Sequence, residues 1–354
     1  MLNKYHRLFT SGISKGQSAS WIGRYFFVRA LFGLGYRIFQ YPVLFPWYIL
    51  TLTFFFRRSN FDRLMVVNGG YPASLLCRCA VIAWRFAGKK PLAVFSFHNS
   101  TVQPKWYYSL PEFVIDRAVI NSSKQIVTVS MNCLDSLNIR KAFFGCGKLR
   151  YIYNGIANPA LHVTDNDRSD GNVDEPYCLM LATYEPRKGH VFLLQAFRFV
   201  VSEFPGVRLR IYGFGSPLEK QVVADEVKRL SLNHHVSIND FTVNTASLLA
   251  NARVLVVPSQ AYESFGLTII EAMAFGTPVV TTDVGGMPEV LAGSDAGYVC
   301  ASNDPVAFAD AIKRILGNPS LAAELGKNGR ITYEKNFTSS IMVQQYHSMI
   351  VESV

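Results

Sequence analysis

Short runs of β-branched and other apolar residues alternate along most of the chain with longer segments in which apolar positions recur every three or four residues. The short runs are typical of buried strands and the longer segments of amphipathic helices. From residue 62 onward the two alternate with a period of roughly thirty residues, which predicts Rossmann-like parallel sheets. Strands are expected at residues 64–67, 92–97, 125–130, 151–156, 207–212, 236–238, 254–257 and 279–282. Helices are expected at residues 73–86, 113–121, 132–143, 190–201, 218–230, 245–251, 267–275, 305–316, 320–333 and 339–351.

The pattern is clearest between residues 254 and 288. A β-branched run at 254–257 is followed by a loop, a helix-period segment at 267–275 and a second strand that begins at residue 279. The helix stops at Gly276, two residues before Pro278, which is a usual helix end. Strand, loop, helix and strand in this order make the unit of a parallel α/β sheet.

Two carboxylates bracket the junction between this loop and this helix. Glu263 precedes the helix and Glu271 lies inside it. Ser264 can cap the helix, and Gly266 lets backbone N–H groups at the helix start approach an anion closely. A ligand with a negative group on those N–H groups and hydroxyls near the carboxylates would be a sugar attached to a phosphate.

The run 263–271, with a glutamate at each end, resembles the E-x7-E signature of retaining GT-B glycosyltransferases of family 4, which use nucleotide sugars. The likeness continues through residues 276–280 and 285–289. It implies an α/β fold in which two Rossmann-like domains face a cleft. No strand is found before residue 62, so the N-terminal domain is expected to lack the family's first strand or to carry a diverged one. An ordinary buried βαβ unit with incidental glutamates is the alternative.

The resemblance implies roles for the residues of this loop. Glu263 would contact the donor sugar, and Glu271 would hold the ribose hydroxyls. Gly213 and Gly215 would let the nucleotide approach closely. The remaining donor-binding residues would be Ser264, Phe265, Gly266, Leu267 and Thr268.

Positive charge for the donor diphosphate is expected from Lys188, which matches the lysine of an R-x4-K-G motif in the family. The family arginine falls on Thr183, which cannot supply that charge. Arg187 is the candidate replacement, although adjacent side chains on a turn need not face the same way. Fixed positive charge matters here because the diphosphate gains negative charge as it leaves.

His98 follows the strand expected at 92–97, and ligands of open α/β sheets bind at the carboxyl ends of strands. The run 97–100 resembles an F-H-x-S segment of mannosyltransferases that use lipid acceptors. The likeness implies a histidine in the catalytic cleft that hydrogen-bonds the donor sugar or orients the acceptor hydroxyl. A purely structural histidine is the alternative.

The charge of the chain is concentrated at its start. Residues 1–60 hold eight Lys and Arg and no Asp or Glu, which is +8 of the formal +10. This segment is also rich in aromatic residues, so it suits an anionic membrane surface; a basic surface over a buried aromatic helix is the alternative. The apolar stretch 43–56 is shorter than the roughly 20 residues of a membrane span, so we expect a buried or interfacial helix. The rest of the chain is nearly balanced, which argues against a nucleic-acid partner.

No metal site or cofactor is expected. The six cysteines are scattered and the histidines show no spacing suited to a metal, which fits free thiols in a reducing cytoplasm. Asp165 and Asp167 form a D-x-D sequence, but they lie in a polar, acidic linker and not after a hydrophobic strand. We therefore interpret them as solvated charge.

The 354 residues suffice for two domains. The expected division is a basic aromatic segment at 1–60, a Rossmann-like acceptor domain at 61–163, a linker at 164–176, a nucleotide-sugar-binding domain at 177–337 and a helix at 338–354 that crosses back to the N-terminal domain. The resemblance implies a cytoplasmic, retaining, metal-independent hexosyltransferase that can sit peripherally on the inner face of the membrane. Its donor would be a UDP- or GDP-sugar and its acceptor a glycan or lipid-linked saccharide.

Two alternative functions stay open. A non-catalytic or truncated family member would bind sugar nucleotide without turnover, and Thr183 and the missing first strand motivate this alternative. A GT-B-fold sugar-nucleotide epimerase would need acidic residues near the reacting sugar carbon, and no motif for them is found.

Overall fold

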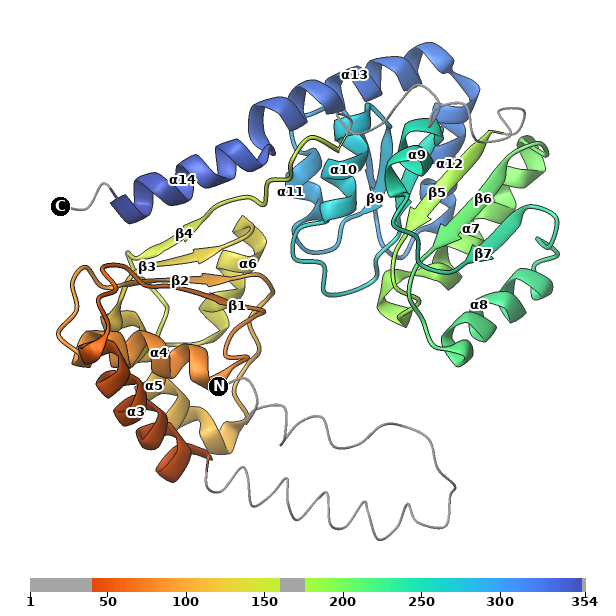
Figure 1. Ribbon diagram of the computed structural model, residues 1–354. Helices are drawn as coiled ribbons and strands as arrows, with labels where there is room; N and C mark the ends of the chain where they lie inside the picture. The colour runs from red at the N-terminus through yellow and green to blue at the C-terminus, as the bar shows by residue number, and fades with distance from the viewer. Residues whose placement is uncertain (1–39, 160–175, 352–354) are drawn as a thin grey trace, which may run out of the picture.

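The computed structural model describes residues 40–159 and 176–351. These residues form two α/β domains, each built on its own parallel sheet, and the last helices run from the second domain back across the first (Figure 1). The two Rossmann-like domains expected from the sequence are thereby confirmed. The expectations for residues 1–39 and for Asp165 and Asp167 in the linker lie outside the described residues.

The first domain holds a four-stranded sheet in the order β1-β2-β3-β4, with every neighbouring pair parallel. Its strands are β1 (Met65–Asn68), β2 (Ala93–Phe97), β3 (Ser123–Thr128) and β4 (Leu149–Tyr151). One face is covered by α3 (Phe45–Arg58), α4 (Leu75–Phe86) and α5 (Ser109–Ser122). Phe56 at the end of α3 is buried against Trp84 of α4, so α3 is part of this domain's core.

The other face of the first sheet is covered by α14 (Ser339–Val351), the last helix of the described chain. Val94, Val127 and Ile152 of the first domain are buried in one cluster. The α14 residues that pack on them are Met342, Tyr346, Met349 and Ile350. The C-terminal helix is therefore fastened to the first domain by an apolar contact.

The second domain holds a six-stranded sheet in the order β10-β9-β8-β5-β6-β7, again parallel throughout. Its strands are β5 (Tyr177–Leu181), β6 (Arg208–Tyr212), β7 (Val236–Asn239), β8 (Val254–Val257), β9 (Val279–Thr282) and β10 (Gly297–Cys300). Its longer helices are α7 (His190–Glu203), α8 (Pro217–Arg229), α9 (Thr245–Asn251), α10 (Leu267–Phe275), α12 (Pro305–Gly317) and α13 (Pro319–Asn336). The central strands β5, β8 and β9 are almost fully buried because helices cover both faces of the sheet.

One expected helix is wrong. The segment 132–143 forms only α6 (Met131–Ser136), followed by a 3-10 turn (Leu137–Ile139). The chain leaves the helix because Arg140 turns into the interior, where it is 2% exposed and contacts Asp116 and Glu112. β4 also ends at Tyr151, earlier than expected, and Ile156 pairs instead with Thr338. The strands β5 and β10 and the short helix α11 (Met287–Leu291) are not among the elements expected from the sequence.

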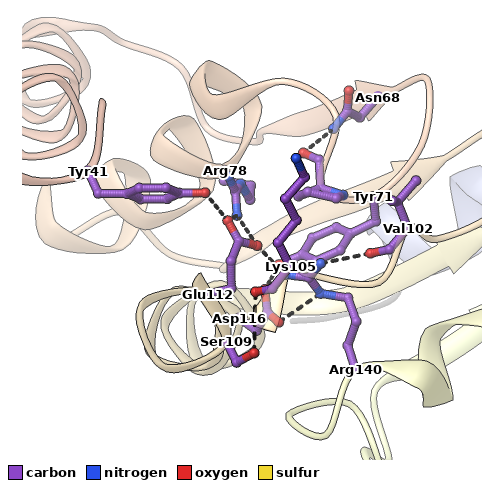
Figure 2. Close-up of polar contacts among 11 residues, drawn as sticks. Tyr41, Asn68, Tyr71, Arg78, Val102, Lys105, Ser109, Glu112, Asp116 and Arg140 are labelled. Atoms are coloured by element: carbon purple, nitrogen blue, oxygen red, sulfur yellow. Dashed lines mark hydrogen bonds and ion pairs between the residues drawn. The ribbon is translucent and has the colours of Figure 1, made fainter. Parts of the chain in front are cut away.

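Arg140 belongs to a buried ionic network beneath the first sheet (Figure 2). Two arginines, Arg78 and Arg140, face two carboxylates, Glu112 and Asp116, and the formal charges balance. Tyr41 donates to Glu112, and Tyr71 donates to Asp116 at 2.5 Å. Arg140 also donates to the carbonyl of Val102 at 2.9 Å, so the network holds the segment that follows β2.

The apolar stretch 43–56 forms most of α3, and Phe56 is its one buried residue. One side of α3 packs on the core of the first domain through Phe45, Ile49 and Leu52, whereas Trp47, Leu50 and Phe54 on the other side are exposed. Within residues 40–159 and 176–351, no helix combines the length and the apolar character that crossing a membrane requires.

Candidate active site

A cavity of about 400 Å³ opens between the two domains at the carboxyl ends of β2 and β8. From the first domain it is lined by His98, Asn99 and Asn154. From the second domain it is lined chiefly by the Arg187–Lys188 turn and by the loop that leads into α10, at residues 257–259 and 262–268. Most of the residues singled out in the sequence therefore meet in one cavity: His98, Arg187, Lys188, Glu263, Ser264, Phe265, Gly266, Leu267 and Thr268.

The cavity contains an ion pair between two residues predicted to be catalytic. Lys188 Nζ lies 2.5 Å from Glu263 Oε2, and the hydroxyl of Ser259 lies 3.4 Å from the same oxygen. Both side chains are largely shielded, at 17% and 16% exposure. A bound diphosphate would compete with Glu263 for the lysine, which would leave the carboxylate oxygens available to sugar hydroxyls.

Arg187 lies on the same side of its turn as Lys188, because both line the cavity. Its Nε donates to Glu185 at 2.7 Å, and its Nη1 donates to the carbonyl of Tyr262 at 3.2 Å. Thr183, at the family's arginine position, donates its hydroxyl to Glu185 at 2.9 Å. These hydrogen bonds, that of Arg187 first, lower the pKa of Glu185. Arg187 thus gives the site a second cation, but its guanidinium is paired with the carboxylate of Glu185.

The start of α10 is shaped by Gly266, which has a φ of +98°. L side chains rarely adopt this backbone conformation, so the turn favours glycine. The first N–H groups of a helix have no acceptor within the helix and can bind an anion. Phe265 is itself buried against Tyr153 and Phe337, so only its backbone can serve a ligand.

Three predicted donor residues do not line this cavity: Glu271, Gly213 and Gly215. Glu271 is half-buried in α10, and burial raises the pKa of its carboxyl. A Cβ at Gly213 would lie 1.7 Å from the carbonyl oxygen of Ala182, and one at Gly215 would lie 2.6 Å from Tyr184 Cβ. Both glycines are therefore already required by contact with the loop that follows β5.

His98 follows β2 directly, and its backbone N–H donates to Asn68 at the end of β1. Its Nε2 lies 3.4 Å from the hydroxyl of Ser96, which in turn is 3.0 Å from the hydroxyl of Tyr346 in α14. Partial burial lowers the pKa of His98. A neutral imidazole at this position can accept or donate a hydrogen bond in the cleft.

Two cavity residues of the first domain, Asn99 and Asn154, were not assigned from the sequence. Asn99 Oδ1 accepts a hydrogen bond from the hydroxyl of Ser264 at 2.6 Å, so it connects the two domains. Its place directly after His98 at a strand end is the signal that could have identified it. Among the described residues, no three or more His, Cys, Asp or Glu side chains gather as a metal site.

Parts of the chain are similar to known glycosyltransferases. The family described as "Glycosyl transferases group 1" matches residues 164–332. N-acetyl-alpha-D-glucosaminyl L-malate synthase of Bacillus anthracis is 34% identical over 157 residues, 44% of this chain and 40% of the relative. A phosphatidyl-myo-inositol mannosyltransferase of Mycolicibacterium smegmatis is 37% identical over 146 residues, 41% of this chain and 37% of the relative. The matched part of the chain thus spans about two fifths of the length of these curated relatives.

Solved structures extend the likeness to both domains. A glycosyltransferase from Rickettsia africae has a TM-score of 0.74 at 19% identity and covers 88% of this chain and 83% of its own. HepE of Anabaena in complex with UDP has a TM-score of 0.72 at 18% identity and covers 86% and 82%. The fold is therefore the GT-B arrangement of two Rossmann-like domains. In sequence, residues 164–332 match the family of group 1 glycosyl transferases.

Proposed function

We propose that the protein transfers a hexose-type sugar, with retention of configuration, from a UDP- or GDP-sugar to a glycan or lipid-linked saccharide. The observation that carries the proposal is the cavity in which His98 faces the Lys188–Glu263 pair and the loop before α10. A curated relative named as a capsular polysaccharide biosynthesis glycosyltransferase, of Staphylococcus aureus, supports a glycan acceptor; it is 32% identical over 164 residues.

The residues have separable roles in this reaction. Lys188 and Arg187, with the N–H groups at the start of α10, bind the diphosphate and stabilise the charge that it gains. Glu263 binds hydroxyls of the donor sugar, and His98 hydrogen-bonds the sugar or orients the acceptor hydroxyl. Glu271 holds the ribose, and its raised pKa means that it is protonated more readily than an ordinary glutamate.

Retention requires the acceptor to attack the face that the diphosphate leaves. The bond between the anomeric carbon and the diphosphate oxygen breaks, and its electron pair goes to the diphosphate. The acceptor oxygen forms the new bond to the anomeric carbon, and its proton passes to the leaving phosphate oxygen. Because protein cations offset the diphosphate charge, we propose that no metal ion takes part.

Donor screening tests the proposal. The full chain is incubated with UDP- and GDP-sugars and a lipid extract, with and without EDTA, and the released UDP or GDP is measured. We expect release with one donor class, unchanged by EDTA. Nucleotide binding without release for any donor would instead support the second candidate, a non-catalytic sugar-nucleotide-binding protein, which the threonine at position 183 favours.

A lipid-linked acceptor would bring the protein to the cytoplasmic face of a membrane, and α3 supports such peripheral contact. Trp47, Leu50 and Phe54 recur on one side of the helix and are 62%, 67% and 56% exposed. Arg57 and Arg58 follow, and the guanidinium of Arg58 lies 3.7 Å from the centre of the Phe54 ring. An apolar face next to basic residues suits an anionic lipid surface.

Flotation of the full chain with vesicles, with and without phosphatidylserine, tests the membrane contact. We expect binding to the anionic vesicles at low salt and a several-fold loss on Leu50→Ser. Val306→Ser removes an equally apolar, half-exposed residue from α12 of the second domain and should leave binding unchanged. Equal behaviour of the two variants, or no flotation of the wild type, would reject this surface.

A further inference from the structure

A carboxylate outside the predicted site joins the two domains beside the cleft. Glu289 lies in α11 of the second domain, and its two oxygens accept hydrogen bonds from the backbone N–H groups of Met131 (2.7 Å) and Asn132 (2.6 Å). These two residues begin α6 of the first domain, and the two helices face each other in Figure 1. N–H groups at a helix start have no acceptor within their own helix, so Glu289 supplies what α6 lacks.

The start of α6 also contacts the loop that leads into α10, here called the donor loop. Ser130, the N-cap residue of α6, accepts a hydrogen bond from the backbone of Cys133 and donates its hydroxyl to the carbonyl of Ser264 at 2.8 Å. The Ser264 side chain donates to Asn99, which neighbours His98. The first domain is thus hydrogen-bonded to Ser264 twice, once at its backbone carbonyl and once at its hydroxyl.

Glu289 is coupled to the same loop from within its own domain. Gly285 and Gly286 directly precede α11, and a Cβ on Gly285 would lie 1.8 Å from the carbonyl oxygen of Glu263. The N–H of Gly286 donates to that same oxygen at 2.9 Å. A residue that fixes α6 relative to this turn therefore also fixes it relative to Glu263.

We propose that Glu289 is a positioning residue that holds the first domain, with His98 and Asn99, at the distance from Glu263 that transfer requires. Its hydrogen bonds are charge-assisted and therefore stronger than neutral ones. The groups proposed to bind the nucleotide and its diphosphate all lie in the second domain, so loss of the contact changes the separation of the domains and leaves the nucleotide site itself intact. The kinetic part of the inference rests on the proposed function; the part that concerns domain separation does not.

Two variants remove the contact from opposite sides. Glu289→Gln keeps the size of the side chain but replaces one acceptor oxygen with an amide group, which cannot accept from a backbone N–H. Met131→Pro deletes one of the two backbone donors; the hydroxyl of Tyr153, which donates to Glu289 Oε2 at 3.4 Å, stays in place. Proline is tolerated at the first position of a helix, and Ser130 before it is already extended (φ −158°, ψ 163°), as proline requires. Glu324→Gln, at an exposed position of α13, is the matched control.

The test combines small-angle X-ray scattering of the full chain, UDP binding and sugar transfer. We expect a larger radius of gyration for Glu289→Gln and Met131→Pro, UDP affinity within about twofold of wild type, and kcat lowered tenfold or more. In the double variant the effects should not multiply, because both changes break one contact. The proposal would be overturned if both variants had the radius of gyration of the wild type. It would also be overturned if the kcat loss of the double variant were the product of the two single losses.

The test still decides if a variant does not fold or if the wild type transfers no sugar. Circular dichroism establishes that each variant folds, and if Glu289→Gln does not fold, Met131→Pro alone decides by the same criteria. If the wild type transfers no sugar, the proposed function fails, and scattering still decides whether Glu289 sets the separation of the domains.

Discussion

The buried network in Figure 2 allows a quantitative prediction for Glu112→Gln. Glu112 is 3% exposed and accepts hydrogen bonds from Arg78, at 3.0 Å to each carboxylate oxygen, and from Arg140 and Tyr41. The substitution leaves two buried guanidinium groups facing one carboxylate. Breaking a buried ion pair by removing one partner costs roughly 3–5 kcal/mol. At an m-value of about 2 kcal/mol/M, this lowers the urea midpoint of the first domain by about 1.5–2.5 M.

The assay excludes the second domain because the four tryptophans of the chain, at positions 21, 47, 84 and 106, all precede it. Trp84 is fully buried and donates its indole N–H to Pro91, so its fluorescence should report unfolding of this domain. Glu334→Gln removes an exposed carboxylate that pairs with Arg330, and it should shift stability by less than about 1 kcal/mol.

A second variant tests the cause of the instability. Arg78→Met combined with Glu112→Gln restores the charge balance around Arg140 and Asp116, so the double variant should be more stable than Glu112→Gln alone. Two results would refute the reasoning from uncompensated charge. Glu112→Gln alone could cost less than about 1 kcal/mol, or Arg78→Met could lower the stability of the Glu112→Gln variant by as much as it lowers that of the wild type.

The pH dependence has a definite sign. Burial alone would raise the pKa of Glu112, but the charges of Arg78 and Arg140 and the hydrogen bond from Tyr41 lower it overall. A carboxyl whose pKa is lowered by folding contributes stability above its unfolded pKa of roughly 4.3, and this contribution is lost as pH falls through the folded value. The difference between wild type and Glu112→Gln should therefore shrink in acid.

Three further predictions concern residues that the sequence assigned to the site. Lys188→Met should lower kcat/KM by roughly a hundredfold or more in steady-state transfer, because it removes charge stabilisation of the leaving diphosphate; a change below threefold would contradict that role. Burial lowers the pKa of His98, so its imidazole stays neutral to more acidic pH than an ordinary histidine; an NMR titration should place its midpoint below roughly 6.5, and a midpoint above that value would be the contrary result. Gly213→Ala would put a Cβ 1.7 Å from the Ala182 carbonyl and should lower the melting temperature, whereas Gly206→Ala, with open space around it, should not.

The fold could be predicted where local pattern decides it. The bounds of α9, α10, α14, β8 and β9 agree residue for residue with those expected. For α10, β8 and β9 the bounds are set by the neighbouring stop residues Gly276, Pro258 and Pro278. The helix expected at 132–143 failed because Arg140 is drawn inward by Glu112 and Asp116, more than twenty residues earlier in the chain. Such a tertiary attraction leaves no trace in the local period of apolar residues.

The candidate site was likewise predictable where a local motif marks it, and not where it depends on contacts between the two domains. The residues in and around the loop before α10 were grouped by a motif, and His98 was added because strand ends converge at one edge of a sheet. Glu289 was noticed only as part of a run of family-like residues, because its partners are backbone N–H groups. Backbone donors have no identity in a sequence, so the contact becomes visible only when the two domains are in place.

The most direct test of the central claim follows released nucleotide and transferred sugar together under single-turnover conditions. The wild type is compared with Glu263→Ala and His98→Ala, each verified to be folded by circular dichroism. The proposed function predicts equal amounts of nucleotide and transferred sugar for the wild type and no transfer for either variant. Full activity of both variants would contradict the assignment of this cavity as the active site.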